Sequence, residues 1–276
     1  MKINAPGILA CAGFVAFLCG PTELVAQNVT LGSAANFAVL GATPKVTNTG
    51  PTVVTGDVGV WPAASITGFP PGRANGTLHF GDSVAQQAQT DLTAAYNDAA
   101  GRACPALNNL TGLVLGSGGT VLTLGPGVYC FSSTAQLTGN LTLNGAGVYI
   151  FQVGSGLTTA SGSSVTLTNG ASACGVWWQV TSSATIGTTT SLAGNVLALS
   201  SITLNTGANV DGRVLARNGT VTLDSNNVTA CSGGPGPPVP PPVAPLGAVP
   251  ALAPSALAIL GIALAAVAFL ALRRAL

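Results

Sequence analysis

Few residues in this chain of 276 could carry out catalysis. The sequence has one histidine, His79, and in its strand-like region the only acids are Asp57, Asp211 and Asp224. Cleavage of a polysaccharide needs paired carboxylates, whereas Asp57 and Asp211 occur in Gly-Asp and Asp-Gly pairs that are typical of turns. His79 has no partner nearby in the sequence, which favours a structural role. With neither a Cys-x-x-Cys pair nor a histidine cluster present, we predict no catalytic site, no metal and no cofactor.

The composition departs from that of an average soluble domain in one respect. Charged residues make up 5% of the chain, against roughly 25% in typical domains. Apolar residues are near normal at 47%, and the missing charge is replaced by 31 Thr, 19 Ser and 17 Asn beside 37 Gly. Disorder is excluded for most of the chain, because it needs low hydrophobicity and high charge. A net charge of +1 also argues against nucleic acid as a partner.

Both ends of the chain are typical of export signals. Residues 1–26 have a short basic start, an apolar stretch and a Leu-Val-Ala cleavage site, and they predict a signal peptide. Residues 233–254 are proline-rich and predict an extended linker. Residues 255–276 hold an apolar segment closed by Arg273 and Arg274, which predicts a membrane helix. We therefore expect residues 27–232 to form an exported domain, secreted or held at the cell surface.

The C-terminal layout resembles the IPTL and PEP sorting signals of Gram-negative bacteria. Val249-Pro250-Ala251-Leu252 precedes the apolar segment and the arginine pair, although the motif itself differs from the usual one. The resemblance implies a membrane sorting protease as a partner, with removal of the tail. A plain membrane anchor is the alternative, and both place the body of the protein outside the cytoplasm.

The body of the chain contains an internal repeat. Six apolar-Thr-apolar triplets have central threonines spaced by 19, 24, 19, 18 and 19 residues: Thr123, Thr142, Thr166, Thr185, Thr203 and Thr222. A second, glycine-led series keeps step with it, beginning at Gly127, Gly147, Gly175, Gly194 and Gly212. Short triplets with period-2 alternation predict half-buried strands. A repeat of about 19 residues with such strands predicts one coil of an all-β solenoid, with its outward threonines in rows about 4.8 Å apart.

One segment and four cysteines stand outside this repeat. From 82 to 100 the apolar residues Val84, Ala88, Leu92, Ala95, Tyr96 and Ala99 fall at helical spacing. Asp82 or Ser83 could cap the start and Gly101 could end it, so we predict one long α-helix packed alongside the solenoid. After removal of residues 1–26, four cysteines allow three disulfide pairings. We favour Cys104 with Cys130 and Cys174 with Cys231.

Several segments resemble the ice-binding family of discontinuous β-solenoids from cold-adapted bacteria, fungi and algae. These segments are 31–40, 49–60, 66–72, 177–180, 194–198 and 212–219, and the similarity covers essentially all of residues 28–230. The resemblance implies a three-faced, discontinuous β-helix, with an N-terminal segment completing the column and a long helix alongside. It also implies that one flat face binds ice through a T-A/G-x-T/N pattern.

This pattern occurs twice, at Thr49-Gly50-Pro51-Thr52 and at Thr206-Gly207-Ala208-Asn209. Thr188 and Ser191 stand 18 residues before Thr206 and Asn209, in the preceding coil. The resemblance therefore implies these ten residues as the ice-binding site. The row formed by the triplet threonines ranks second as the candidate face.

The composition supports the same function on physical grounds. A threonine hydroxyl can anchor a water, the methyl limits disordered hydration, and β-branching fixes χ1. Charged groups would hold water in the wrong geometry for a neutral crystal. We expect an antifreeze protein that adsorbs to ice and inhibits its growth and recrystallisation. The alternative is a surface adhesin or carbohydrate-binding solenoid, in which one ring of the Trp177-Trp178 pair is exposed for stacking on a sugar.

Overall fold

The structure is a computed structural model that describes residues 27–117 and 122–231. The predicted signal peptide, the proline-rich linker and the C-terminal apolar segment lie outside these residues. Within the described part of the chain, no helix is long and apolar enough to cross a membrane.

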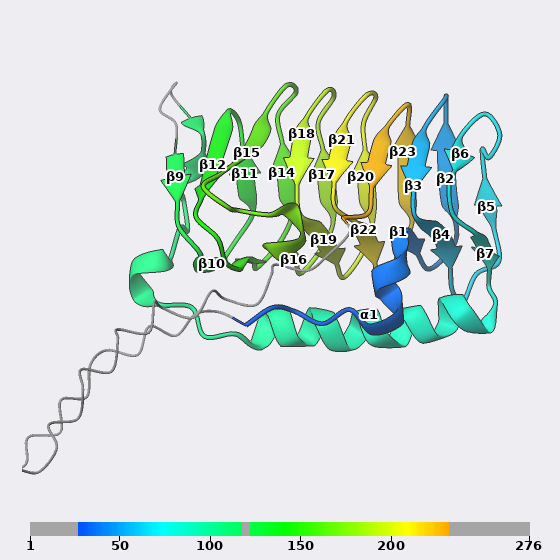
Figure 1. Ribbon diagram of the computed structural model, residues 1–276, viewed down its shortest axis with the longest axis horizontal. Coiled ribbons are helices and arrows are strands. Elements are labelled where there is room, and N and C mark those ends of the chain that lie inside the picture. Colours follow the sequence, from blue (N-terminus) through cyan, green and yellow to red (C-terminus); the bar gives the residue numbers. More distant parts are fainter. Residues whose placement is uncertain (1–26, 118–121, 232–276) are drawn as a thin grey trace, which may run out of the picture. The chain divides into compact units, whose positions relative to one another are not determined.

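Three parallel sheets of eight strands each form a three-faced β-solenoid (Figure 1). Sheet A has, in spatial order, β10 (Gly127–Phe131), β13 (Tyr149–Val153), β16 (Val176–Val180), β19 (Asn195–Ala198), β22 (Val214–Ala216), β1 (Phe37–Gly41), β4 (Asp57–Val60) and β7 (Leu78–Phe80). Sheet B has β5 (Ile66–Thr67), β2 (Val46–Thr49), β23 (Val221–Asp224), β20 (Ile202–Leu204), β17 (Ala184–Ile186), β14 (Leu157–Thr159), β11 (Ala135–Leu137) and β8 (Val114–Leu115). Sheet C has β6 (Arg73–Ala74), β3 (Val53–Thr55), β24 (Asn227–Thr229), β21 (Asn209–Asp211), β18 (Ser191–Ala193), β15 (Ser164–Thr168), β12 (Asn140–Asn144) and β9 (Leu122–Leu124).

The coils do not stack in sequence order, which makes the solenoid discontinuous. Strand β1 pairs with β22, with Val39 opposite Val214, so the N-terminal coil continues the column beyond the coil that comes last in the described chain. In Figure 1 the blue N-terminal strands lie directly beside the orange C-terminal ones. This confirms the expected three-faced, discontinuous architecture.

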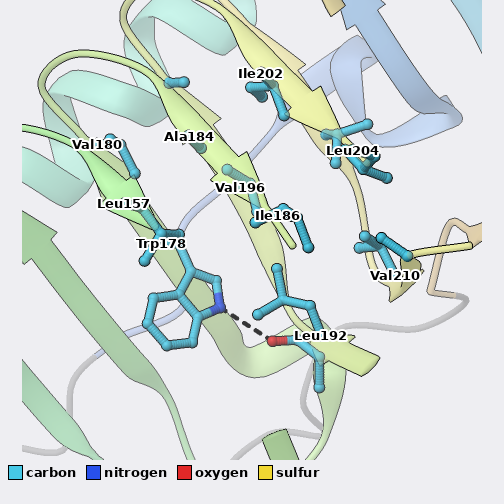
Figure 2. Close-up of a cluster of buried hydrophobic side chains, with 14 of the residues drawn as sticks. Leu157, Trp178, Val180, Ala184, Ile186, Leu192, Val196, Ile202, Leu204 and Val210 are labelled. Carbon is cyan, nitrogen blue, oxygen red and sulfur yellow. Dashed lines mark hydrogen bonds between the residues drawn. The ribbon is translucent and has the colours of Figure 1, made fainter. Parts of the chain in front are cut away.

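The space between the sheets is filled by the inward side chains of every strand. Leu157, Ile186, Ile202 and Leu204 are at most 1% exposed, and Figure 2 shows them converging with Trp178. The indole of Trp178 donates a hydrogen bond to the Ala193 carbonyl at 3.0 Å (Figure 2). Burial of such aliphatic side chains contributes about 1.5–3 kcal/mol each, so every coil is held by its neighbours above and below.

One helix covers the outer surface of sheet A. Helix α1 spans Ser83–Gly101, and the Asp82 side chain caps it by accepting a hydrogen bond from the Ala85 backbone. The predicted apolar stripe is buried except for Val84, which is 46% exposed, because Ala85 occupies the inward position instead. The Ser33 hydroxyl and backbone N–H, from the 3₁₀-helix η1 (Gly32–Asn36), both donate to Asp91 and lower the pKa of its carboxyl. Two further 3₁₀-helices, η2 and η4, are Ala106–Asn108 and Ala173–Gly175.

Both favoured disulfides are present. Cys104–Cys130 ties the segment after α1 to β10, and Cys174–Cys231 ties η4 to the end of the described chain. The first joins residues 26 apart in sequence and the second joins residues 57 apart. Each bridge therefore restricts a long loop of the unfolded chain.

The prediction that the six triplet threonines form one row is wrong. Thr123, Thr142 and Thr166 are paired in sheet C, whereas Thr185, Thr203 and Thr222 are paired in sheet B. The step from Thr166 to Thr185 is a change of face, because the residue beside Thr185 in sheet B is Thr158. Both faces use apolar-Thr strands, so the series crosses from one to the other without a change in spacing.

Candidate functional site

The outer surface of sheet B carries an uninterrupted row of threonines. We call Thr158, Thr185, Thr203, Thr222, Thr47 and Thr67, in spatial order, the threonine row. The backbone register places each of them opposite the next in the neighbouring strand. Gln136 and Val114 continue the row towards one end of the sheet.

The strands beneath the threonine row fix both its spacing and its orientation. Ala184, Ile186, Ile202 and Leu204 flank Thr185 and Thr203 and are buried, so the alternating pleat directs the threonines outward. Neighbouring parallel strands lie about 4.8 Å apart, which sets the repeat along the row. From Thr158 to Thr47 both chain neighbours of each row threonine are buried, so this part of the row is held rigidly from below.

Serine and threonine residues line one margin of this surface. Ser183, Ser201 and Thr220 precede β17, β20 and β23, and backbone hydrogen bonds hold them in register through Ala184 N to Ser201 O and Ile202 N to Thr220 O. They stand two residues before Thr185, Thr203 and Thr222, so a second line of hydroxyls runs parallel to the threonine row. Hydroxyl groups thus repeat both along and across the sheet.

The other margin lies at the corner between sheets B and C. We call Thr188, Thr206, Asp224 and Thr49 the corner column. The backbone bonds Thr189 N to Thr206 O, Gly207 N to Asp224 O and Ser225 N to Thr49 O stack its members one per coil. The structure therefore brings together the three leading threonines of the predicted site, with Asp224 between Thr206 and Thr49.

The other predicted residues divide between the corner and sheet C. Pro51 is exposed, and Gly50 and Gly207 are half-buried in the corner turns. Ser191 and Asn209 pair with each other at the start of β18 and β21, so they lie on sheet C rather than on sheet B. The predicted pattern therefore spans a corner of the solenoid instead of a single flat face.

Two predicted contact residues are corrected by the structure. Thr52 and Ala208 are 0% exposed, so their side chains cannot contact ice. In each of these coils the last residue of the turn, directly before the sheet C strand, points into the core, and Thr190 and Asn226 are buried at the equivalent position. The register pairs Asn209 with Asn227 and Asn227 with Val53. The turn after Thr49 is thus one residue longer, which puts Thr52 at the buried position of Ala208.

Two residues with formal charge lie on the outer surface of sheet B within the described chain, Lys45 and Asp224. Lys45 is exposed beside the line that contains Thr220. Asp224 is half-buried and accepts hydrogen bonds from the hydroxyls of Thr206 and Ser225, at 2.5 and 3.1 Å. The rest of this surface is neutral, so its chemistry is that of hydroxyls, amides and methyl groups.

The outer surface of sheet C is uneven. Its residues change from coil to coil, from Thr142 and Thr166 at one end to Ala193, Asp211 and Thr229 further along. Strand β15 pairs with β18 only at Ser164 opposite Ser191, and a cleft of about 450 Å³ opens there between Leu167, Leu192 and Asp211. Among the described residues of sheet C, no continuous row of one residue type crosses the face.

The groups that could do acid-base chemistry serve other roles. His79, for which the sequence offered no partner, has Nδ1 2.8 Å from Asp82 Oδ2 and Nε2 3.7 Å from Asp57 Oδ2. The hydrogen bond from the Ala85 N–H, together with that to His79, lowers the pKa of the Asp82 carboxyl. Asp57 also accepts from the Thr77 backbone. The contacts of His79 with Asp82 and Asp57 join β7 to the start of α1 and to β4, which supports a structural role for this histidine.

The expected exposed tryptophan is absent. Trp177 is 2% exposed and donates to Asn28 at 3.1 Å, and Trp178 is fully buried in the core. Strand β16 is buried on both of its faces, one by the core and the other by α1. Neither ring can stack on a sugar, which removes the observation that favoured carbohydrate binding.

Half of the threonine row was not predicted from the sequence. Thr158, Thr47 and Thr67 each follow an apolar residue at the start of a strand, but the third residue is not aliphatic: it is Thr159, Asn48 and Gly68. A search for apolar-Thr pairs, without the third position, would have found them.

Comparisons with known proteins bear on the family and the fold. A family model described as Ice-binding-like matches residues 40–229. An ice-binding protein of Nostoc sp. (strain HG1) is 52% identical over 238 residues, covering 84% of this chain and 85% of the relative. The crystal structure of an ice-binding protein from an Antarctic biological consortium has a TM-score of 0.70 at 48% identity, covering 74% of this chain and 92% of that one. The ice-binding protein of the ascomycete Antarctomyces psychrotrophicus also has a TM-score of 0.70, at 40% identity, covering 75% of this chain and all of the other.

Proposed function

The chain belongs to the ice-binding-like family, and from that premise we propose that it is an antifreeze protein that adsorbs to ice through the outer surface of sheet B. The observation that carries this assignment is the threonine row, one threonine per coil over six successive strands. The corner column on one side, and the line of Ser183, Ser201 and Thr220 on the other, widen the row into a two-dimensional array.

Adsorption follows from the repetition of weak contacts. A hydroxyl contributes about 1 kcal/mol or less when it replaces a bond to liquid water, so no single threonine can hold a crystal. A rigid array has little side-chain entropy to lose, because β-branching restricts each χ1 and the packed core holds the backbone beneath it. Many aligned hydroxyls can therefore order one layer of water together, and that layer joins the ice.

The neutrality of this surface also favours adsorption to ice. A charged group must be stripped of its hydration shell to touch ice, which costs far more than a hydroxyl contact returns. Adsorbed molecules force the ice front to grow as curved surfaces between them, and growth stops until the temperature falls further. The process needs no catalytic step, and we propose a binding role without enzymatic activity.

The location of the protein is part of this proposal. Two disulfides in the described chain support an oxidising compartment outside the cytoplasm. The signal peptide, the membrane helix and the sorting protease remain predictions from residues 1–26 and 233–276. We propose an exported protein, secreted or held at the cell envelope, where external ice is met.

The assay for this function is thermal hysteresis of purified residues 27–232, together with ice recrystallisation in a frozen sucrose film. We expect faceted crystals and a measurable freezing gap. Thr206→Tyr and Thr188→Tyr should weaken both readouts without a change in the circular dichroism spectrum. A folded wild-type domain in whose presence ice grows as in buffer would rule the function out.

A further inference from the structure

We propose that Asp224 limits the ice-binding activity of this protein, so that its replacement by threonine strengthens adsorption. The inference rests on the proposed function and concerns one residue of the same surface. Asp224 is the last residue of strand β23. Among the described residues, it supplies the one carboxylate on the outer face of sheet B.

Its position is set by the backbone rather than by its own side chain. Asp224 is opposite Thr49 in the register of β2 and β23. On its other side, Asp224 O accepts a hydrogen bond of 3.1 Å from Gly207 N, directly after Thr206. Asp224 thus occupies the place of a threonine in a column that would otherwise read Thr188, Thr206, Thr, Thr49.

The carboxylate also changes what its neighbours present to water. It accepts hydrogen bonds from the hydroxyls of Thr206 and Ser225. Each of these hydroxyls has one hydrogen to donate, so neither can donate to a water of the ice layer. One carboxylate therefore affects three positions: its own, and the hydroxyls of Thr206 and Ser225, which can only accept hydrogen bonds from water.

The charge adds a second penalty. A carboxylate orders water strongly around itself, and part of that hydration must be removed when the surface meets ice. Lys45 is less harmful, because its long aliphatic stem lets the ammonium group turn away from the surface. Asp224 has a short side chain that two hydrogen bonds hold in place, so it cannot turn aside.

Threonine fits the same backbone. Asp224 lies at the end of a β-strand, where β-branched residues are favoured. The hydrogen bond between its backbone N–H and Asn226 Oδ1, at 2.6 Å, does not involve the Asp224 side chain and survives the substitution. The substitution should therefore leave the corner turn unchanged.

The test compares the purified wild-type protein with Asp224→Thr and Asp224→Asn by thermal hysteresis at equal concentration. Asp224→Thr should raise hysteresis about twofold, since adsorption sums many weak contacts and three of them are restored. Asp224→Asn removes the charge but not the acceptor, and it should give a smaller increase. Asp211→Thr makes the same chemical change on sheet C and should leave hysteresis unchanged.

The outcomes separate this inference from the proposed function. Hysteresis in the wild type that Asp224→Thr leaves equal or lowers, with an unchanged melting temperature, overturns the role of Asp224 alone. An equal gain from Asp211→Thr also overturns it, because the effect would then be one of net charge. Absence of hysteresis in the wild type and in all three variants overturns both the inference and the proposed function.

Discussion

Sheets B and C are built from the same short parallel strands, yet only sheet B presents a continuous surface. Both contain outward threonines: six in the threonine row of sheet B and a run at Thr123, Thr142 and Thr166 in sheet C. On sheet C the run ends where β15 and β18 share a single pair of residues. A threonine-rich composition therefore does not by itself make an ice-binding face. An unbroken register is needed as well.

The break coincides with a change in strand length within sheet C. Strands β12 and β15 have five residues each, whereas β18, β21 and β24 have three. Between these two groups of strands the pairing is reduced to Ser164 opposite Ser191, and the cleft opens there. In sheet B, β14 and β17 have three residues each and pair at two positions, so the threonine row continues from Thr158 to Thr185 without a break.

The largest expected effect comes from a bulky residue in the middle of the threonine row. Thr203→Tyr should lower thermal hysteresis about tenfold or more, because a protruding ring lifts Thr185 and Thr222 from the ice as well. Loss of about 1.4 kcal/mol of adsorption free energy lowers the adsorption constant about tenfold. Thr142→Tyr is its matched control, since Thr142 also lies between two paired threonines but on sheet C. Equal losses in the two variants would remove the distinction between the sheets.

A smaller loss is expected at the corner between the two sheets. Thr206→Tyr should lower hysteresis to about half, because the column at the edge already contains Asp224 and fewer neighbours depend on it. Ser191→Tyr, on the sheet C side of the same turn, should have little effect. A greater loss from Thr206→Tyr than from Thr203→Tyr would shift the centre of the ice-binding surface to the corner.

The two sheets also show how far the sequence alone could lead. The helix and the repeat were predictable because they depend on local patterns, and the even number of cysteines indicated disulfides. The favoured pairing was one of three that the sequence allows, and the pairing in the structure agrees with it. The division of the threonines between sheets B and C could not be predicted, since apolar-Thr strands recur on both faces at the same spacing. Burial of Thr52 was also hidden, because one extra residue in a turn moves a side chain inward without altering the motif.

A modest gain should follow from extension of the threonine row. Gln136 is exposed and pairs with Thr158 at the end of the row. Gln136→Thr should raise hysteresis by roughly a tenth to a third, since it adds one weak contact to a row of six. Val53→Thr also places a new threonine at an exposed position, but on sheet C. If it produced an equal gain, continuity of register would not be the deciding property.

The smallest effect on activity is expected from loss of a disulfide. Replacement of Cys174 and Cys231 by serine should lower the free energy of unfolding by about 4 kcal/mol, given the long loop that the bridge closes. The melting temperature should fall by roughly 10 °C in calorimetry. Hysteresis near 0 °C should not change, because neither residue lies in sheet B. If hysteresis fell together with the melting temperature, the threonine row would depend on this disulfide.

Ice-affinity partitioning tests the central claim most directly. A mixture of the wild type, Thr203→Tyr and Thr142→Tyr, distinguished by mass, is exposed to a slowly growing ice crystal, and the protein in the ice and in the liquid is quantified. Adsorption through sheet B predicts that the wild type and Thr142→Tyr are enriched in the ice while Thr203→Tyr stays in the liquid. Exclusion of Thr142→Tyr, or equal enrichment of all three proteins, would contradict it.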